Sequence, residues 1–222
     1  NLAPADLPKD SGRFDLPIAL GILAASGQID AARLAGWAFA GELSLGGELR
    51  PVRGALAMSL ALQRDGGEQR LVLPPGSAEE AALVPTAHVV RARHLLDVVA
   101  HFRPASPDAP AEPPDDSGWV RLAPTERAVL PNPADLADVK GQVAARRALE
   151  IAAAGGHSLL MVGPPGAGKS MLAQRFAGLL PPMDAQEALE SAAIASLAGR
   201  FHLDRWGQRP TCAPHHLSLI HI

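Results

Sequence analysis

Eight consecutive residues, GPPGAGKS at 163–170, carry the clearest chemical signal in the sequence. They match the pattern G-x-x-x-x-G-K-[S/T], in which glycines let the backbone turn its N–H groups toward phosphate oxygens. In such a loop Lys169 would reach the β and γ phosphates of a nucleotide, and the Ser170 hydroxyl would bind Mg²⁺. The sequence therefore predicts an ATP site whose backbone cradle consists of Gly163, Pro164, Pro165, Gly166, Ala167 and Gly168.

The flanking sequence favours this site over a plain glycine–proline turn. The apolar segment 157–162 predicts a short buried strand before the loop, and the periodicity of 169–180 predicts a helix after it. A strand before the loop and a helix after it are the context that the motif requires. The helix would also direct the positive end of its dipole toward bound phosphate.

Acidic residues suited to hydrolysis are missing after the loop. No apolar strand ending in Asp-Asp or Asp-Glu follows Ser170, although such a strand normally supplies the carboxylate that acts on Mg²⁺ and water. The later aspartates are Asp184, which is expected to cap a helix over 184–197, and Asp204, which no apolar strand precedes. With no candidate catalytic residue, this chain is expected to bind ATP without hydrolysing it.

Composition indicates a globular protein of one or two domains. The chain has 222 residues, 47% of them hydrophobic and 19% charged, and its net charge of −3 gives no general argument for nucleic acid. A single cysteine, Cys212, excludes an internal disulfide and is typical of a reducing cytosol. Because no apolar run is long enough to cross a bilayer and no signal peptide is evident, we expect a cytoplasmic protein without a membrane partner.

A proline-rich, acidic stretch divides the sequence, and we predict a linker over 103–124. The region before it, 1–102, is predicted as an α+β domain. The region after it, 125–216, is predicted as an α/β domain that contains the phosphate loop. In this second region a helix is expected to begin near Gln142 and to stop at Gly155-Gly156.

The first region has clear structural patterns but no visible chemistry. Paired glycines at Gly46-Gly47 indicate a hairpin with a tight two-residue turn, because such turns need positive φ angles. The periodicity also predicts a strand over 70–74 and helices over 15–26, 54–67, 77–83 and 94–102.

Two further motifs join the phosphate loop in a resemblance to a known family. LADVKGQ at 136–142, APHH at 213–216 and the amino-terminal NLAPADLPKDSGRFDLPIALGILAASGQI together resemble the ComM/YifB family of magnesium-chelatase-like AAA+ ATPases over residues 1–216. The resemblance implies a partial domain with the Lon-protease fold, followed by the start of a P-loop AAA+ domain. It also implies a chain truncated at both ends, in which 217–222 form a non-native tail.

The resemblance implies a function as well. Family members are ring-forming ATPases, expected as hexamers, that use ATP and Mg²⁺ and act on DNA, with branch migration during natural transformation as the best-described role. By the same resemblance Val139, Gly141 and Gln142 would lie near the adenine. His215 and His216 match a family motif to which we assign no role.

Two other functions compete with a DNA-remodelling role. A metal-chelatase or protein-remodelling ATPase would share the phosphate loop, and only the resemblance to the fused Lon-like domain favours the DNA-linked family. A Lon-type protease would need a serine nucleophile activated by a lysine. Arg13 and Leu56 stand at those two positions, so no peptidase activity is expected.

Overall fold

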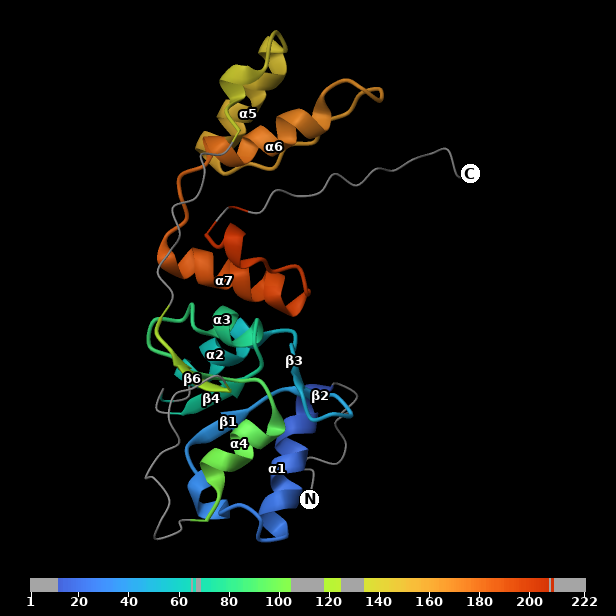
Figure 1. Ribbon diagram of the computed structural model, residues 1–222. Helices are drawn as coiled ribbons and strands as arrows, with labels where there is room; N and C mark the ends of the chain where they lie inside the picture. The colour runs from blue at the N-terminus through green and yellow to red at the C-terminus, as the bar shows by residue number, and fades with distance from the viewer. Residues whose placement is uncertain are drawn as a thin grey trace, which may run out of the picture. The chain divides into compact units, whose positions relative to one another are not determined.

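A four-stranded sheet lies at the centre of the first part of the chain (Figure 1). In this computed structural model the strand order is β1-β4-β5-β6; β1, β4 and β5 are parallel, and β6 is antiparallel to β5. The strands are β1 (Trp37–Phe39), β4 (Arg70–Leu73), β5 (His88–Ala92) and β6 (Trp119–Leu122). A separate hairpin pairs β2 (Glu42–Leu43) with β3 (Leu49–Arg50). The structure describes residues 12–64, 66, 69–104, 118–124, 134–207 and 209.

The described residues fall into two compact units. The first unit, drawn from 1–127 and 192–203, contains the sheet. The second unit, drawn from 128–191 and 204–222, contains α5 (Val143–Gly155) and α6 (Lys169–Leu179). Helix α7 (Ala185–Leu197) contributes residues to both.

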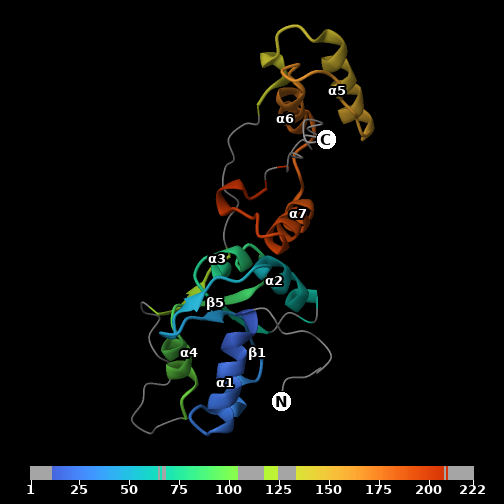
Figure 2. The same ribbon diagram turned by 90° about the vertical axis from the view of Figure 1, so that its right-hand side faces the viewer.

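Helices cover both faces of the sheet in the first unit, as Figures 1 and 2 show. On one face Val72 and Val90 pack against α1 (Asp15–Ala25) and α4 (Leu95–Phe102). On the other face Leu71, Leu73 and Val89 pack against α2 (Ala55–Arg64) and α3 (Ser77–Ala81). Because side chains alternate along a strand, β4 and β5 bury apolar residues on both faces, as expected of strands enclosed by helices. The unit therefore has a mixed α/β architecture.

The helices predicted from periodicity are confirmed. Each of the seven, α1 to α7, begins and ends within a few residues of its expected bounds. Local stop signals explain this success. Gly27 adopts a φ of 74° after α1, and Gly156 adopts a φ of 63° as the C-cap of α5, conformations that glycine reaches without steric cost. The strand predicted over 70–74 is also confirmed as β4.

Several strands were not predicted, and one of them lies in the expected linker. The sequence patterns gave no indication of β1 or β5, which are short and are defined by pairing with β4. Within 103–124, Trp119–Leu122 form strand β6 against β5 instead of a linker. Trp119 is buried and stacks on His101 with 4.3 Å between ring centroids. Burial of this aromatic side chain therefore stabilises a strand where the composition predicts solvated backbone.

The hairpin is confirmed, but its tight two-residue turn is not. Leu43 pairs with Leu49, so residues 44–48 form the connection, and only Gly47 of the two glycines has a positive φ. The hydroxyl of Ser44 accepts a hydrogen bond from the Glu48 amide at 3.0 Å. This bond from a serine side chain to the backbone closes the longer loop, so the connection does not depend on a tight turn at the paired glycines.

His94 joins this hairpin to the start of α4. Its Nδ1 accepts a hydrogen bond from the Leu96 amide at 3.0 Å, so the ring proton lies on Nε2, which donates to the Gly46 carbonyl at 2.8 Å. Asp97 accepts from the His94 amide at 2.9 Å and completes the cap of the helix. One side chain thus satisfies a free helix amide and holds the loop in place.

Replacement of this residue, His94→Ala, is expected to lower the free energy of unfolding by about 1–2 kcal/mol, because it removes both the cap and the bond to the loop. Urea unfolding followed by tryptophan fluorescence measures the change. His88→Ala, at an exposed position, is the matched control and should leave the midpoint nearly unchanged. Equal midpoints for the two variants would contradict the capping role.

Candidate nucleotide-binding site

The loop at 163–168 connects the segment 157–162 to the first residue of α6. Gly166 and Gly168 have φ angles of 79° and 82°, a conformation that costs side-chain-bearing residues about 1–2 kcal/mol. Within the loop the Ala167 amide donates to the Pro164 carbonyl at 3.3 Å. Gly163 does not have a positive φ, so two of the three glycines in the loop are required by backbone conformation.

Lys169 is placed at the mouth of the loop. Its Nζ donates to the carbonyls of Gly163 and Pro164, both at 2.8 Å. Ser170 follows in the first turn of α6 and is half-buried. The ammonium and the hydroxyl therefore lie at the helix N-terminus, where unpaired amides and the helix dipole attract anions.

Gln142 brings a second segment to the loop. Its Nε2 donates to the Ala167 carbonyl at 3.1 Å. Among the described residues it is the only non-glycine with positive φ, at 53°, and it is the N-cap of α5. Gly141 also has a positive φ, of 70°, whereas Val139 is buried. Gln142, at the end of the segment 139–142, therefore lies beside the phosphate loop.

An apolar cluster lies beneath both segments. Leu136, Val139, Leu149 and Leu172 are buried together, and Met161, Phe176 and Leu179 pack against them. These residues come from η3 (Leu136–Asp138) and its C-cap, from α5 and α6, and from the segment 157–162 before the loop. The cluster holds the backbone that carries every predicted site residue.

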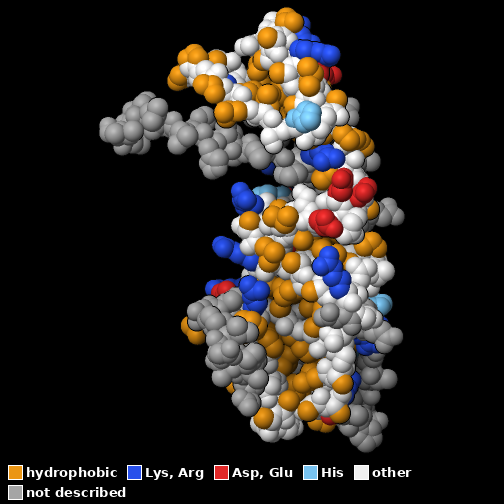
Figure 3. Space-filling model, turned by 180° about the vertical axis from the view of Figure 1, so that it is seen from behind, with side chains coloured by type: hydrophobic (Ala, Val, Ile, Leu, Met, Phe, Trp, Pro, Cys, Tyr) orange, Lys and Arg blue, Asp and Glu red, His pale blue; other side chains and the backbone are white. Residues whose placement is uncertain are grey.

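The segment 157–162 is not the buried strand that its apolar residues predict. It belongs to neither sheet, and the side chains of Leu160 and Val162 are 87% and 88% exposed. Met161, by contrast, packs against the apolar cluster. A buried strand needs neighbouring strands on both edges and cover on both faces, and the second unit contains no strand among its described residues. Hydrophobic side chains consequently lie on the surface of this unit (orange in Figure 3).

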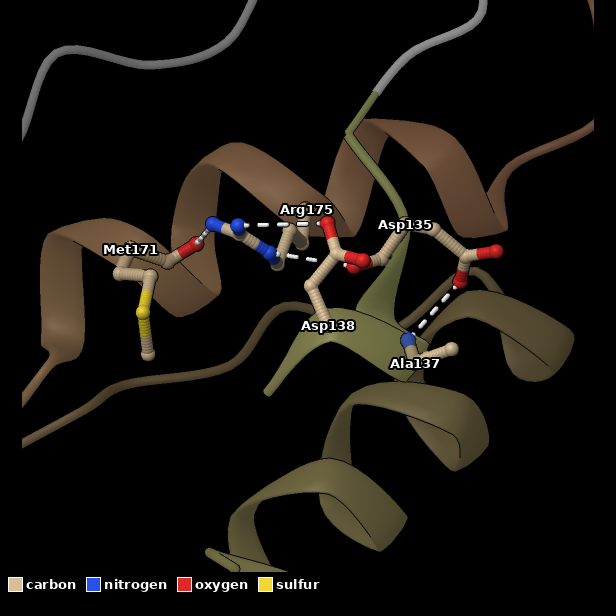
Figure 4. Close-up of polar contacts among 5 residues, drawn as sticks. All are labelled: Asp135, Ala137, Asp138, Met171 and Arg175. Carbon is tan, nitrogen blue, oxygen red and sulfur yellow. Dashed lines mark hydrogen bonds and ion pairs between the residues drawn. The ribbon is translucent and has the colours of Figure 1, made fainter. Parts of the chain in front are cut away.

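Two arginines that the sequence patterns did not indicate contact the segment that leads to Gln142. Arg146 donates to the Val139 carbonyl at 3.3 Å. Arg175 reaches from α6 to the Asp135 carbonyl at 3.1 Å and to the Asp138 carboxylate at 3.5 Å (Figure 4). A signal for Arg175 existed: it shares the helix face of Leu172, Phe176 and Leu179, where a charged residue interrupts an otherwise apolar stripe.

The other candidate residues are described one by one. Asp184 is confirmed as a helix cap: its carboxylate accepts from the Glu187 amide at 2.7 Å, and Glu187 accepts in return from the Asp184 amide at 3.2 Å. Asp204 is exposed in η4 (Leu203–Arg205). At the protease positions, Arg13 lies in η1 (Gly12–Phe14), and Leu56 is fully buried in α2. His215 and His216, with Cys212, lie outside the described residues.

Comparison with known proteins shows which proteins this chain is similar to. The family model described as magnesium chelatase, subunit ChlI, matches residues 135–220, and the model described as subunit ChlI of Mg-chelatase matches residues 1–77. The chain is 46% identical to the competence protein ComM of Haemophilus influenzae over 217 residues, and 44% identical to the protein YifB of Salmonella typhimurium over 224 residues. A protein of Mycobacterium tuberculosis, Rv2897c, is 40% identical over 221 residues.

These alignments cover 97–99% of the chain but only 40–42% of each relative, so the chain spans less than half the length of the curated relatives it matches. Two matching chelatase models and relatives of this similarity define a magnesium-chelatase-like protein of the AAA+ class. The chain belongs to the ComM/YifB family within that class. None of the helices in the described ranges is both long enough and apolar enough to cross a membrane.

The left-handed backbone at Gln142 predicts a difference between two substitutions. Gln142→Ala and Gln142→Gly both remove the bond to the Ala167 carbonyl, but only glycine relieves the cost of a positive φ. We expect the glycine variant to be the more stable of the two by about 1 kcal/mol. Hydrogen exchange at the amides of α5 reports the local opening free energy. Greater protection in the alanine variant would contradict a strained position.

Proposed function

We propose that this chain is the ATP-binding portion of a magnesium-chelatase-like AAA+ ATPase. The observation that carries the proposal is the convergence at the start of α6: two glycines with positive φ, the Lys169 ammonium at the loop mouth, and Gln142 bonded to the loop. These are the parts that hold a polyphosphate chain. The cytosolic location expected from composition is consistent with an ATP-dependent role.

The residues of the loop fit ATP with Mg²⁺. Amides of the loop and of the first turn of α6 would bind phosphate oxygens, and Lys169 would exchange its two carbonyl partners for the phosphates. Ser170 would bind the metal, which when present neutralises phosphate charge. Mg²⁺ at such sites takes few protein ligands besides phosphate oxygens and water.

The proposed domain division follows the family resemblance. Residues 1–102 would be part of a Lon-protease-like domain without peptidase activity, and 125–216 the beginning of a P-loop AAA+ domain. Leu56 stands at the position where the resemblance would require the catalytic lysine. Its apolar side chain is fully buried, which supports the absence of a protease dyad. We also propose that the 222-residue chain binds ATP without turning it over. Phosphate release above background from this chain would contradict that part of the proposal.

Lys169→Ala should weaken ATP binding by about one to two orders of magnitude, because a charge-assisted contact to phosphate is lost. Titration with a fluorescent ATP analogue in the presence of Mg²⁺ measures the affinity. Arg64→Ala, which removes an exposed positive charge from α2, is the matched control and should bind as the wild type does. Equal affinity of the Lys169→Ala variant and the wild type would refute the nucleotide site.

Within this class we propose a ring-forming, hexameric DNA-remodelling enzyme that performs branch migration. The similarity to a relative named a competence protein supports this choice over a metal-chelatase or protein-remodelling ATPase. The complete product of the gene is expected to bind branched DNA more tightly than linear DNA of the same length, and more tightly with ATP than without it. Filter binding measures both ratios. No preference for DNA over a protein substrate would favour the second candidate, a protein-remodelling ATPase.

A further inference from the structure

Arg175 makes contacts that the phosphate loop itself does not require. It lies on α6, and its side chain is only 18% exposed. Figure 4 shows its guanidinium pointing across to the segment that begins at Asp135. It donates through Nε to the Asp135 carbonyl, through one terminal nitrogen to the Met171 carbonyl at 3.3 Å, and through the other to the Asp138 carboxylate. A single planar group therefore bridges two elements of the second unit.

The bridge fixes position more than it adds attraction between charges. The side chain of Asp138 is 60% exposed, and an ion pair of this kind contributes little to stability. Capping of η3 does not need the arginine either, because the Asp135 carboxylate already accepts from the Ala137 amide at 2.9 Å. The contact with the Asp135 carbonyl is different, since a rigid fork held also by Met171 sets the distance between α6 and this backbone.

This distance matters because the two elements carry different parts of the candidate site. Helix α6 begins with Lys169 and Ser170, on the phosphate side. The segment held by Arg175 continues from η3 into Val139, Gly141 and Gln142, on the proposed adenine side. Gln142 ties the far end of this segment to the loop through Ala167, and Arg175 ties its near end to the helix. The segment is therefore held at both ends.

We propose that Arg175 is a positioning residue that places the base-binding segment relative to the phosphate-binding helix. The inference rests on the proposed function and extends it. Arg175 contributes to recognition of the nucleoside part of ATP without contacting phosphate. Its replacement therefore impairs binding of a nucleotide but not binding of a phosphate chain that has no base.

The test compares two probes, a fluorescent ATP analogue and inorganic tripolyphosphate as its competitor, each with Mg²⁺. For Arg175→Ala we expect affinity for ATP to fall about tenfold and affinity for tripolyphosphate to stay within about twofold of the wild type. Arg175→Lys keeps the charge but loses the fork, so it should lose ATP affinity to a similar degree. Arg147→Ala, at an exposed arginine of α5 paired with Glu150, is the matched control and should alter neither affinity. Lys169→Ala should weaken both probes.

Each other outcome has a definite meaning. Unchanged ATP affinity in a folded Arg175→Ala chain overturns the positioning role alone. Equal losses for ATP and tripolyphosphate, with recovery in Arg175→Lys, would make Arg175 a phosphate-attracting charge and also overturn it. If circular dichroism shows that the alanine variant is unfolded, the lysine variant decides. A wild-type chain that binds neither probe refutes the nucleotide site, and the positioning role with it.

Discussion

Burial of one small apolar cluster is the constraint on which the candidate site depends. Leu136, Val139, Leu149 and Leu172 come from three separate helical elements and leave water together. Full burial of such a side chain contributes about 1.5–3 kcal/mol, which is more than a typical hydrogen bond at the surface adds. The cluster therefore brings the elements together, and the polar contacts of Gln142 and Arg175 then select one arrangement among those that the cluster permits.

The parts of the structure that could be predicted from sequence are those with local causes. The loop at 163–168 follows from its glycines and the lysine after them, and α5 and α6 follow from periodicity bounded by glycine or proline. The cap formed by Asp184 also follows from neighbours within one helical turn. In each case the residues that determine the conformation lie within a few positions of the residues that adopt it.

The parts that could not be predicted depend on partners far along the chain. Strands β1 and β5 are defined by pairing with β4, and β6 by pairing with β5, so short segments with weak patterns become strands only when the sheet forms. For the segment 157–162 the error is the opposite, since a buried strand was predicted and none forms. An apolar sequence specifies a buried strand only where other strands enclose it. Arg175 was missed because its carbonyl partner at Asp135 lies 40 positions away, beyond the reach of a local motif.

The apolar segment 157–162 before the loop also has a consequence for the handling of the protein. The side chains of Leu160 and Val162 are 87% and 88% exposed, while Met161 between them packs against the apolar cluster. Exposed apolar segments can act as templates for pairing with another chain, which is the usual origin of aggregation through strand edges. We therefore expect this segment to lower the solubility of the isolated polypeptide, and charged substitutions at Leu160 and Val162 to raise it.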